Sequence, residues 1–481
     1  KVTGELRVVG LFTATAYTHS VNEIPLLRAK VEQVEDHFGF DPLSHSGRML
    51  RNTLESYPRD DLFQIDTDLL ARYCEQIMEL AERPRVRALA RIDHFDRFVS
   101  IIVYVPRENY NSAVREKIGA YLASAYQGHV SAYYPAFPEG GTARVHFIIG
   151  RRDGKTPRIA QPKLEEAIRA ISTPWEERFV GLAGADAPVI ETTFAFQEAF
   201  SPEQTVSDLP NILACAGGEP IRISLYERQE EERLILALKI FHAEDHLALS
   251  RRVPLLENLG FQVVSERTFD LELPDAGKRI VLHDMELELP EGDRIDFAKE
   301  APLIEEAFLA AFAGLVDNDS FNRLVLLTGL SVREVTVLRA YARYLRQTGI
   351  VYSQAHIADT LARYPAISRR IFALFRDGFD PAIGEKQRER KLTDHHAAIE
   401  EALIAVPNLD DDRTFRRFVN AIDSTLRTNY FQRGADGKPK PLLAFKFDPK
   451  LLEGLPQPRP FREIFVYGVE VEGVHLRFGK V

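Results

Sequence analysis

The chain is poor in the residues that hold small scaffolds together by covalent bonds or metal ions. Its 481 residues include two cysteines, three methionines and one tryptophan. A disulfide framework or a structural zinc site needs more thiols than Cys74 and Cys215, and both lie in apolar local patterns. We therefore predict two buried free thiols, which fit a cytoplasmic protein.

Long apolar runs and an excess of positive charge are also missing. No uninterrupted apolar stretch approaches the ~18 residues of a membrane span, and no secretory signal is visible. Lysine and arginine number 61 against 71 acidic residues, which gives a formal net charge of −10. Non-specific nucleic-acid binding normally needs a basic surface. We therefore predict neither a membrane nor a nucleic-acid partner.

Motifs for catalysis and cofactor binding are absent as well. The sequence has no G-x-G-x-x-G after a strand, no G-x-x-x-x-G-K-[ST] phosphate loop, no H-E-x-x-H and no C-x-x-C. Without the first of these motifs, no dinucleotide-binding fold can be placed in the chain. We therefore assign no catalytic, cofactor-binding or metal-binding residue to the span.

The patterns that are present indicate an α+β protein of several modules. Hydrophobic residues make up 45% and charged residues 27% of the chain, and its length exceeds what one core usually supports. The predicted parts are a strand (5–17) plus helical segment at 1–85, an α+β module at 86–189, a helical linker at 190–218, a second α+β module at 219–316, a helical domain at 317–435 and a further strand-rich part at 436–481.

Each α+β module is predicted to be an antiparallel sheet with helices packed on one face. Residues 86–185 alternate in the order β, β, α, β, β, α, which suits this architecture. The segment ALKIFHAEDHLALSRRVPLLENLGFQVVSERT (237–268) resembles the ACT domain, a small ferredoxin-like regulatory fold, and the first module fits the same plan. The resemblance implies tandem ACT-like sandwiches combined with all-α segments.

Four long strings in the right order resemble the large-subunit bacterial NAD-dependent glutamate dehydrogenases. They are GLFTATAYTHSVNEIPLLRAKV (10–31), YVPRENYNSAVREKI (104–118), RTNYFQRGADGKPKPLLAFKFDP (427–449) and EIFVYGVEVEGVHLRFGKV (463–481). The last string resembles the entry into the catalytic domain, so residues 436–481 are expected to be its truncated beginning. The half-buried strand pattern that runs to Val481, and Lys1 in place of a start methionine, lead us to expect a longer natural chain.

The resemblance implies a function and a cofactor for the parent protein. The reaction is oxidation of L-glutamate to 2-oxoglutarate and ammonia, with NAD bound by a part of the parent beyond Val481. This span is expected to be an inactive regulatory and oligomerisation region of a homo-oligomer, with an amino acid as a possible effector. The alternative is a stand-alone amino-acid-sensing or scaffold protein.

The most notable polar cluster lies in KIFHAEDHLAL, with His242, Glu244, Asp245 and His246. A metal pair would need both histidines on one helix, whereas this segment spans a strand end and a helix start. Asp245 is expected to cap the helix that starts near Leu247. ACT domains usually have a glycine in this turn, so we expect the cluster to act in packing or subunit contact rather than in amino-acid binding.

Two further places are weighed as sites. Arg107 and Arg115, in PRENYNSAVREK, could bind an anion at a helix N-terminus, although structural salt bridges are the simpler interpretation. The adjacent His395 and His396 are expected to be solvated surface of a polar helix, with metal binding as the alternative.

Overall fold

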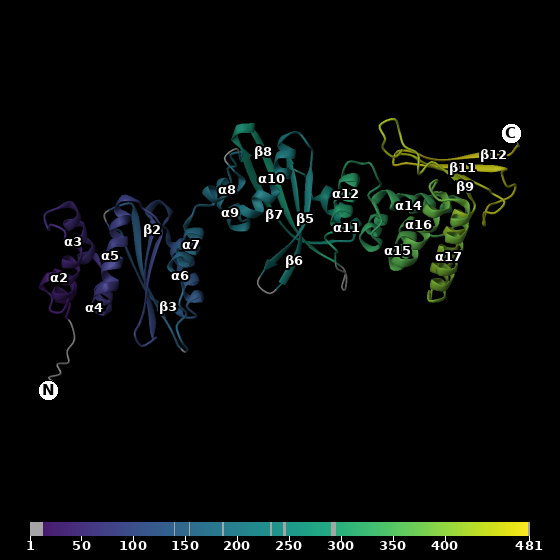
Figure 1. The fold of residues 1–481 in the computed structure, drawn as a ribbon. Helices are drawn as coiled ribbons and strands as arrows, with labels where there is room; N and C mark the ends of the chain where they lie inside the picture. Colours follow the sequence, from purple (N-terminus) through teal and green to yellow (C-terminus); the bar gives the residue numbers. More distant parts are fainter. Residues whose placement is uncertain are drawn as a thin grey trace. The chain divides into compact units, whose positions relative to one another are not determined.

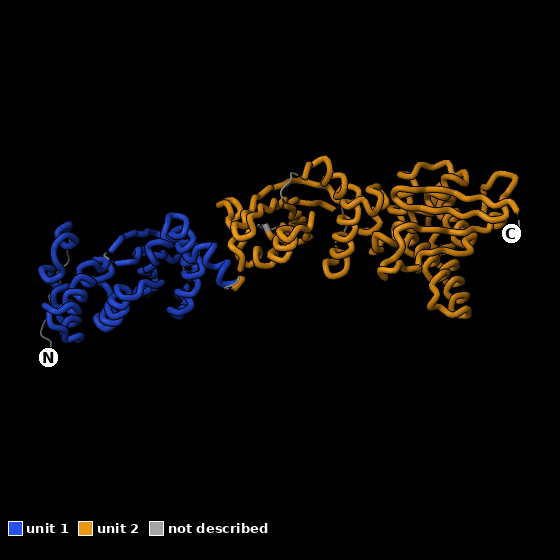
Figure 2. The backbone as a smooth tube through the Cα atoms, turned by 90° about the horizontal axis from the view of Figure 1, so that it is seen from above, with its two compact units in different colours: residues 1–182 blue, residues 183–481 orange. Residues whose placement is uncertain are grey.

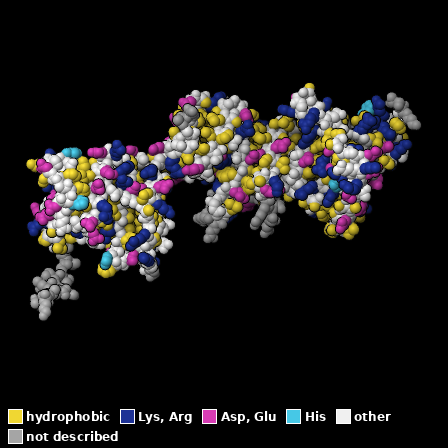
Figure 3. All heavy atoms as spheres, in the orientation of Figure 1, with side chains coloured by type: hydrophobic (Ala, Val, Ile, Leu, Met, Phe, Trp, Pro, Cys, Tyr) yellow, Lys and Arg dark blue, Asp and Glu magenta, His cyan; other side chains and the backbone are white. Residues whose placement is uncertain are grey.

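The computed structural model describes residues 13–479 except 139, 153, 185–186, 231–232, 244–246 and 290–294. The chain divides into two compact units, residues 1–182 and 183–481, which are coloured separately in Figure 2. Acidic and basic side chains are intermixed on the visible surface of both units (Figure 3).

Unit 1 begins with a group of helices. They are α1 (Thr15–Thr18), η1 (Val21–Glu23), α2 (Leu27–Phe38), α3 (His45–Ser56), α4 (Arg59–Gln64) and α5 (Thr67–Glu82). The strand predicted at 5–17 lies partly outside the described residues, and its described end is wrong because residues 15–18 are helical. Tertiary contacts outweigh the β-forming side chains here: Ala16 is buried and the Tyr17 hydroxyl donates to Asp60 at 2.6 Å.

The first module follows in the same unit. Its elements are β1 (Arg87–Ile92), β2 (Phe98–Pro106), η2 (Arg107–Asn109), α6 (Ser112–Ala125), β3 (His129–Ala136), β4 (Thr142–Gly150) and α7 (Gln161–Ser172), with α8 (Trp175–Ala183) after them. The strands pair in the order β1-β2-β4-β3, and every pairing is antiparallel. The predicted order ββαββα is confirmed.

The sheet of the first module is covered on both faces (Figure 1). Its own helices α6 and α7 close one face over an aliphatic core that includes Val103, Ile118 and Ile168. The opposite face contributes Ile102 and Tyr104 to a separate core shared with α2, α3 and α5. The helices on one face of the sheet confirm the prediction. The sequence did not predict the second helical layer, which the preceding helices α2, α3 and α5 form on the other face.

Unit 2 repeats this topology. Its first elements are α9 (Phe194–Ala199), α10 (Pro202–Ala216), β5 (Arg222–Glu230), β6 (Arg233–Ala243), α11 (Leu249–Leu259), β7 (Gln262–Leu273), η3 (Pro274–Ala276), β8 (Lys278–Glu288) and α12 (Ala301–Phe312). The antiparallel order is β5-β6-β8-β7. In both modules the first strand takes the edge place that the last strand of a βαββαβ ferredoxin-like unit would fill. The predicted tandem ferredoxin-like fold is confirmed.

The rest of unit 2 is a helical layer beneath a third sheet. The elements are η4 (Ser320–Asn322), α13 (Arg323–Thr328), α14 (Val332–Gln347), α15 (Gln354–Arg363), α16 (Pro365–Phe379), α17 (Glu385–Ile404), α18 (Leu409–Asp423), β9 (Thr425–Thr428), β10 (Leu443–Phe447), β11 (Arg462–Tyr467) and β12 (Glu472–Arg477). The sheet is antiparallel in the order β12-β11-β10-β9. One continuous hydrophobic core joins the second module, these helices and this sheet.

Two further expectations concern cysteine and membrane-spanning segments. Cys74 and Cys215 are buried and free, as predicted. Among the described residues no helix combines the length and apolar character of a membrane span, and no group of three or more metal-ligating side chains comes together.

Candidate functional site

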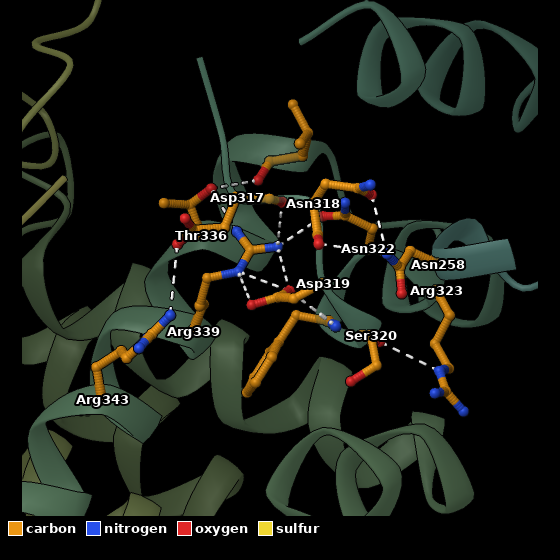
Figure 4. Close-up of polar contacts among 12 residues, drawn as sticks. Asn258, Asp317, Asn318, Asp319, Ser320, Asn322, Arg323, Thr336, Arg339 and Arg343 are labelled. Atoms are coloured by element: carbon orange, nitrogen blue, oxygen red, sulfur yellow. Dashed lines mark hydrogen bonds and ion pairs between the residues drawn. The ribbon is translucent and has the colours of Figure 1, made fainter. Parts of the chain in front are cut away.

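An extended polar network in unit 2 surrounds Arg339 on α14. This side chain is fully buried, and its guanidinium donates to the Asp319 carboxylate at 3.0 Å and to Asn322 Oδ1 at 2.6 Å (Figure 4). It also donates to the Asp317 carbonyl at 3.4 Å. A buried guanidinium is stable only when its donors are satisfied. The segment 317–322 thus provides the acceptors that hold Arg339.

Asp317 extends this network to the third sheet. The hydroxyl of Tyr467, at the end of β11, donates to the Asp317 carboxylate, and Arg343, one helical turn after Arg339, lies 3.9 Å from the same carboxylate. Burial and the neighbouring Asp317 raise the pKa of Tyr467, so the phenol remains a proton donor. Residues 150 positions apart are joined directly here.

The same segment is bonded to the second module. The Asn258 amide on α11 donates to Asn318 Oδ1 at 3.1 Å, while Arg323 donates to the Ser320 carbonyl at 3.1 Å (Figure 4). Arg323 also forms an ion pair with Asp359 on α15 at 3.1 Å. We call residues 317–323 with Arg339, Arg343, Tyr467 and Asn258 the Arg339 junction.

The other side of α14 supports the third sheet. Tyr344 stacks on Phe447 with ring centroids 4.1 Å apart, and its hydroxyl donates to Glu463 on β11 at 2.8 Å. Tyr341 shares a hydrogen bond with Thr425 at 2.9 Å. Burial raises the pKa of the Glu463 carboxyl, and the Tyr344 hydroxyl partly offsets that effect. Helix α14 therefore contacts the junction with one side and the sheet with the other.

The arrangement around Arg339 is suited to mechanical coupling. Arg339 is fully enclosed, and its guanidinium is held by the Asp319 carboxylate and by Asn322. Removing one partner of such a buried pair leaves the other charge uncompensated, at a cost of about 3–5 kcal/mol. The junction thus links three layers of unit 2 firmly.

A second polar cluster lies inside the second module, at the predicted site. His242 closes β6, and its Nε2 is 2.9 Å from Nε2 of His283 on β8. Arg252, on α11, donates to the same His283 nitrogen at 2.8 Å and also forms an ion pair with Glu266 on β7. The other three predicted residues, Glu244, Asp245 and His246, lie outside the described residues.

The hydrogen bonds fix the protonation of His283. Its Nδ1 donates to Glu266 at 2.8 Å, and its Nε2 must accept because a guanidinium can only donate. His283 is therefore neutral, and His242 donates through Nε2. Burial and the Arg252 charge lower the pKa of His283 to about 4. Sequence patterns suggested His242 but gave no signal for His283, Arg252 or Glu266, which come together only through strand pairing.

The opposite face of this sheet holds another set of buried charges. Lys239 forms an ion pair with Asp208 on α10 and lies over the Phe200 ring at 4.4 Å. Asp284 is fully buried and forms ion pairs with Arg228 at 3.0 Å and with Arg267 at 2.7 Å. Lys239 stands within the apolar run RLILALKIF, and a buried strand rarely contains a lysine that has no partner. The sequence therefore contained a signal for a buried ion pair at this position.

The structure places Arg107 and Arg115 in unit 1, each above an aromatic ring. Arg107 lies 5.3 Å from the ring of Phe137, and Arg115 lies 4.5 Å from that of Tyr133. Arg115 also contacts the adjacent Glu116 at 3.1 Å. Cation–π stacking on the segment that carries strand β3 is thus a contact that both guanidiniums share.

The expectation that His395 and His396 are solvated is wrong for His395. This side chain is buried and its Nε2 lies 3.0 Å from Asp377, which also binds Lys391 at 3.1 Å. Hydrogen bonds from these groups lower the pKa of Asp377 to about 2 despite its burial. Packing of α16 against α17 buries the histidine. His396 is partly exposed and lies 3.2 Å from Asp423.

Five models of known protein families match successive parts of the chain. The matching family models are glutamate dehydrogenase helical motif 1 (residues 24–83), ACT2 domain (87–176), ACT3 domain (220–300) and helical motif 3 (316–381), and the bacterial NAD-glutamate dehydrogenase catalytic domain (398–481). The resemblance to the bacterial NAD-glutamate dehydrogenases is confirmed. By this division, the Arg339 junction connects the ACT3, helical-motif and catalytic-domain regions.

Curated relatives align along essentially the whole chain. The NAD-specific glutamate dehydrogenase of Halomonas elongata is 38% identical over 492 residues, covering 100% of this chain. Those of Pseudomonas aeruginosa and Mycobacterium tuberculosis are 36% and 31% identical, covering 100% and 99% of the chain. The chain spans 30–31% of the length of these relatives.

Proposed function

We propose that this span is the regulatory and assembly region of an NAD-dependent glutamate dehydrogenase. The parent enzyme would oxidise L-glutamate with NAD and water to 2-oxoglutarate, ammonia and NADH. The continuous core of unit 2, in which the ACT3 region, the helical layer and the first catalytic-domain sheet are packed together, carries this proposal. A change in the ACT3 region would reach the catalytic domain through the Arg339 junction.

The described residues do not fit a nicotinamide cofactor. All three sheets in the described part of the chain are antiparallel, so they lack the carboxyl edge of parallel strands at which dinucleotides bind. The buried charged side chains of the second module form ion pairs with one another. We therefore place NAD binding in other parts of the parent protein.

We also propose that the turn after β6 is no amino-acid site. An effector carboxylate would need a cation, but Arg252 is already bound to Glu266 and to the Leu247 carbonyl. Titration of glutamate and aspartate into the chain by calorimetry tests this: no heat that depends on Arg252 is expected. Saturable binding that is lost in Arg252→Gln would show that the turn is an effector site.

Activity measurements test the assignment to a regulatory region. The 481-residue chain is expected to give no glutamate-dependent NADH formation, whereas the full-length parent should be active. Glutamate-dependent NADH formation by the chain alone would contradict it. In the full-length parent, Tyr467→Phe removes one bond of the Arg339 junction, and we expect it to alter the rate. Phe95→Leu, an exposed change in unit 1, serves as the control.

A further inference from the structure

Unit 1 contains a cleft of about 740 Å³ on the outer face of the first sheet. Helices α3 and α5 form one wall, and strands β2 and β4 form the other. Its volume is in the range of small-molecule sites, which run from about 300 to 1,000 Å³. The cleft lies on the face away from α6 and α7, so it is distinct from the turn that precedes the helix of an ACT-like module.

Two arginines that line the cleft have no acidic partner among the residues that the structure describes. Arg144, half-buried on β4, donates through Nη1 to the Ser56 carbonyl, and its buried Nε–H has no hydrogen-bond partner among the described residues. Arg48 donates only to the Leu43 carbonyl, at 2.8 and 3.2 Å. Within the described part of the chain, neither guanidinium forms an ion pair with a carboxylate. Two positive charges thus remain unneutralised at the cleft.

Among the described residues, Glu55 is the one carboxylate that lines the cleft, and it does not cancel these two charges. Glu55 accepts hydrogen bonds from the Ser20 hydroxyl and the Val21 amide, and it pairs with Arg59 at 2.9 Å. Its charge is thereby compensated on the side of the helical segment. His45 is the remaining titratable side chain of the α3 wall. The electrostatic balance of the cleft therefore favours an anion.

The rest of the lining combines polar side chains, such as Asn52 and Thr142, with an apolar part. Met49, Ile77, Met78 and Leu80 come from α3 and α5. Tyr104 closes the floor beside Arg144; burial raises its pKa to about 12, while the Arg144 charge acts in the opposite direction. An occupant that matches this lining carries one anionic group and an apolar body.

We propose that this cleft binds a small organic anion whose carboxylate or phosphate contacts Arg144 and Arg48 and whose apolar part lies on Met49 and Met78. A guanidinium offers two parallel donors to such a group, and charge-assisted pairs of this kind are the strong ones. The proposal adds a ligand site to unit 1 and does not depend on the parent's dehydrogenase activity.

Calorimetry on the 481-residue chain with matched probes tests the proposal. Hexanoate and hexyl phosphate carry both features; hexanamide lacks the charge, while acetate and inorganic phosphate lack the apolar body. We expect saturable one-site binding of hexanoate or hexyl phosphate and at least about ten-fold weaker binding of the three others. The absence of saturable binding of both hexyl probes up to about 10 mM would overturn the proposal.

Variants locate the site. Arg144→Gln is expected to raise the Kd about ten- to a hundred-fold, and Arg48→Gln to raise it less because Arg48 is more exposed. Arg28→Gln, an exposed arginine on α2, should leave the Kd unchanged. If Arg144→Gln fails to fold, Met78→Trp, which fills the cleft and keeps its charges, should abolish binding. Binding that survives the folded charge variant or Met78→Trp would place the ligand elsewhere and contradict the proposal.

Discussion

The two modules of this chain share one strand order and differ in what lies between their layers. In the first module, the helix-covered face is closed by aliphatic side chains such as Val103 and Ile168. In the second, the same layer holds the hydrogen-bonded group of His283, Arg252 and Glu266. The first module also shares its outer core with the helices that precede it, whereas the second is continuous with the helices and sheet that follow.

From this difference we infer that one fold serves two purposes in this chain. The first module leaves a cleft with unpaired arginines on its outer face, as a binding module would. The second pairs its buried charges internally, and its helix α11 is linked to α14 and β11 through the Arg339 junction, as a transmitting module would be. Since topology is common to both, the division of roles rests on side chains.

The largest expected effect comes from breaking the Arg339 junction. Arg339→Leu leaves Asp319 without its buried partner, so the free energy of unfolding of unit 2 should fall by about 3–5 kcal/mol. Urea unfolding of the 481-residue chain, followed separately in the two units by hydrogen exchange, measures this. Arg346→Leu, an exposed change on the same helix, should stay within about 0.5 kcal/mol. A loss below about 1 kcal/mol for Arg339→Leu would show that the junction is not a major tie.

The corresponding substitution in unit 1, at a buried ion pair, should destabilise unit 1 alone. Asp61 is buried and accepts from Arg91 at 2.6 and 2.8 Å and from Tyr57 at 3.1 Å. Asp61→Asn should lower the stability of this unit by about 2–4 kcal/mol, because Arg91 keeps its charge without an anion. Equal destabilisation of both units in the same hydrogen-exchange experiment would contradict the finding that, among the described residues, the two units share no core.

Acid should weaken the second module through His283. Its pKa is about 4 in the folded chain and near 6.5 when unfolded, so between these values the unfolded chain binds the extra proton. Stability is thus complete above pH 6.5 and is lost as the pH falls toward 4. Between pH 7 and 5 the loss should be about 1–2 kcal/mol, and it should be absent in His283→Gln, which cannot titrate. Identical pH profiles for the two proteins would refute a neutral, buried His283 facing Arg252, His242 and Glu266.

The smallest expected effect concerns the aromatic edge of the first module. Arg115→Met removes the guanidinium above Tyr133 and keeps an apolar side chain of similar length. The stability of unit 1 should fall by about 0.5–1 kcal/mol, which is typical of an exposed cation–π contact. Thermal unfolding of Arg115→Met and of the double variant with Tyr133→Leu would measure it. If the stability lost in the double variant equals the sum of the losses in the two single variants, the two side chains do not interact.

Much of the architecture could be predicted from local patterns. Strand alternation indicated the order ββαββα. The capping box of Ser331 and Glu334 at the start of α14 is likewise a pattern that can be read from the sequence. The candidate site was harder to predict from the sequence. Arg339 and Asp317 meet Tyr467 through contacts between distant parts of the sequence, and His395 is buried only because α16 packs against α17. Periodicity carries no information about such contacts.

Hydrogen exchange on wild-type chain and Arg339→Leu tests most directly whether the second module and the third sheet are coupled. Coupling through the Arg339 junction predicts that amide protection falls together in β7, β8, β10 and β11, while protection in β2 and β4 of unit 1 is unchanged. Loss of protection limited to the surroundings of α14, with β11 as protected as in the wild type, would contradict the coupling.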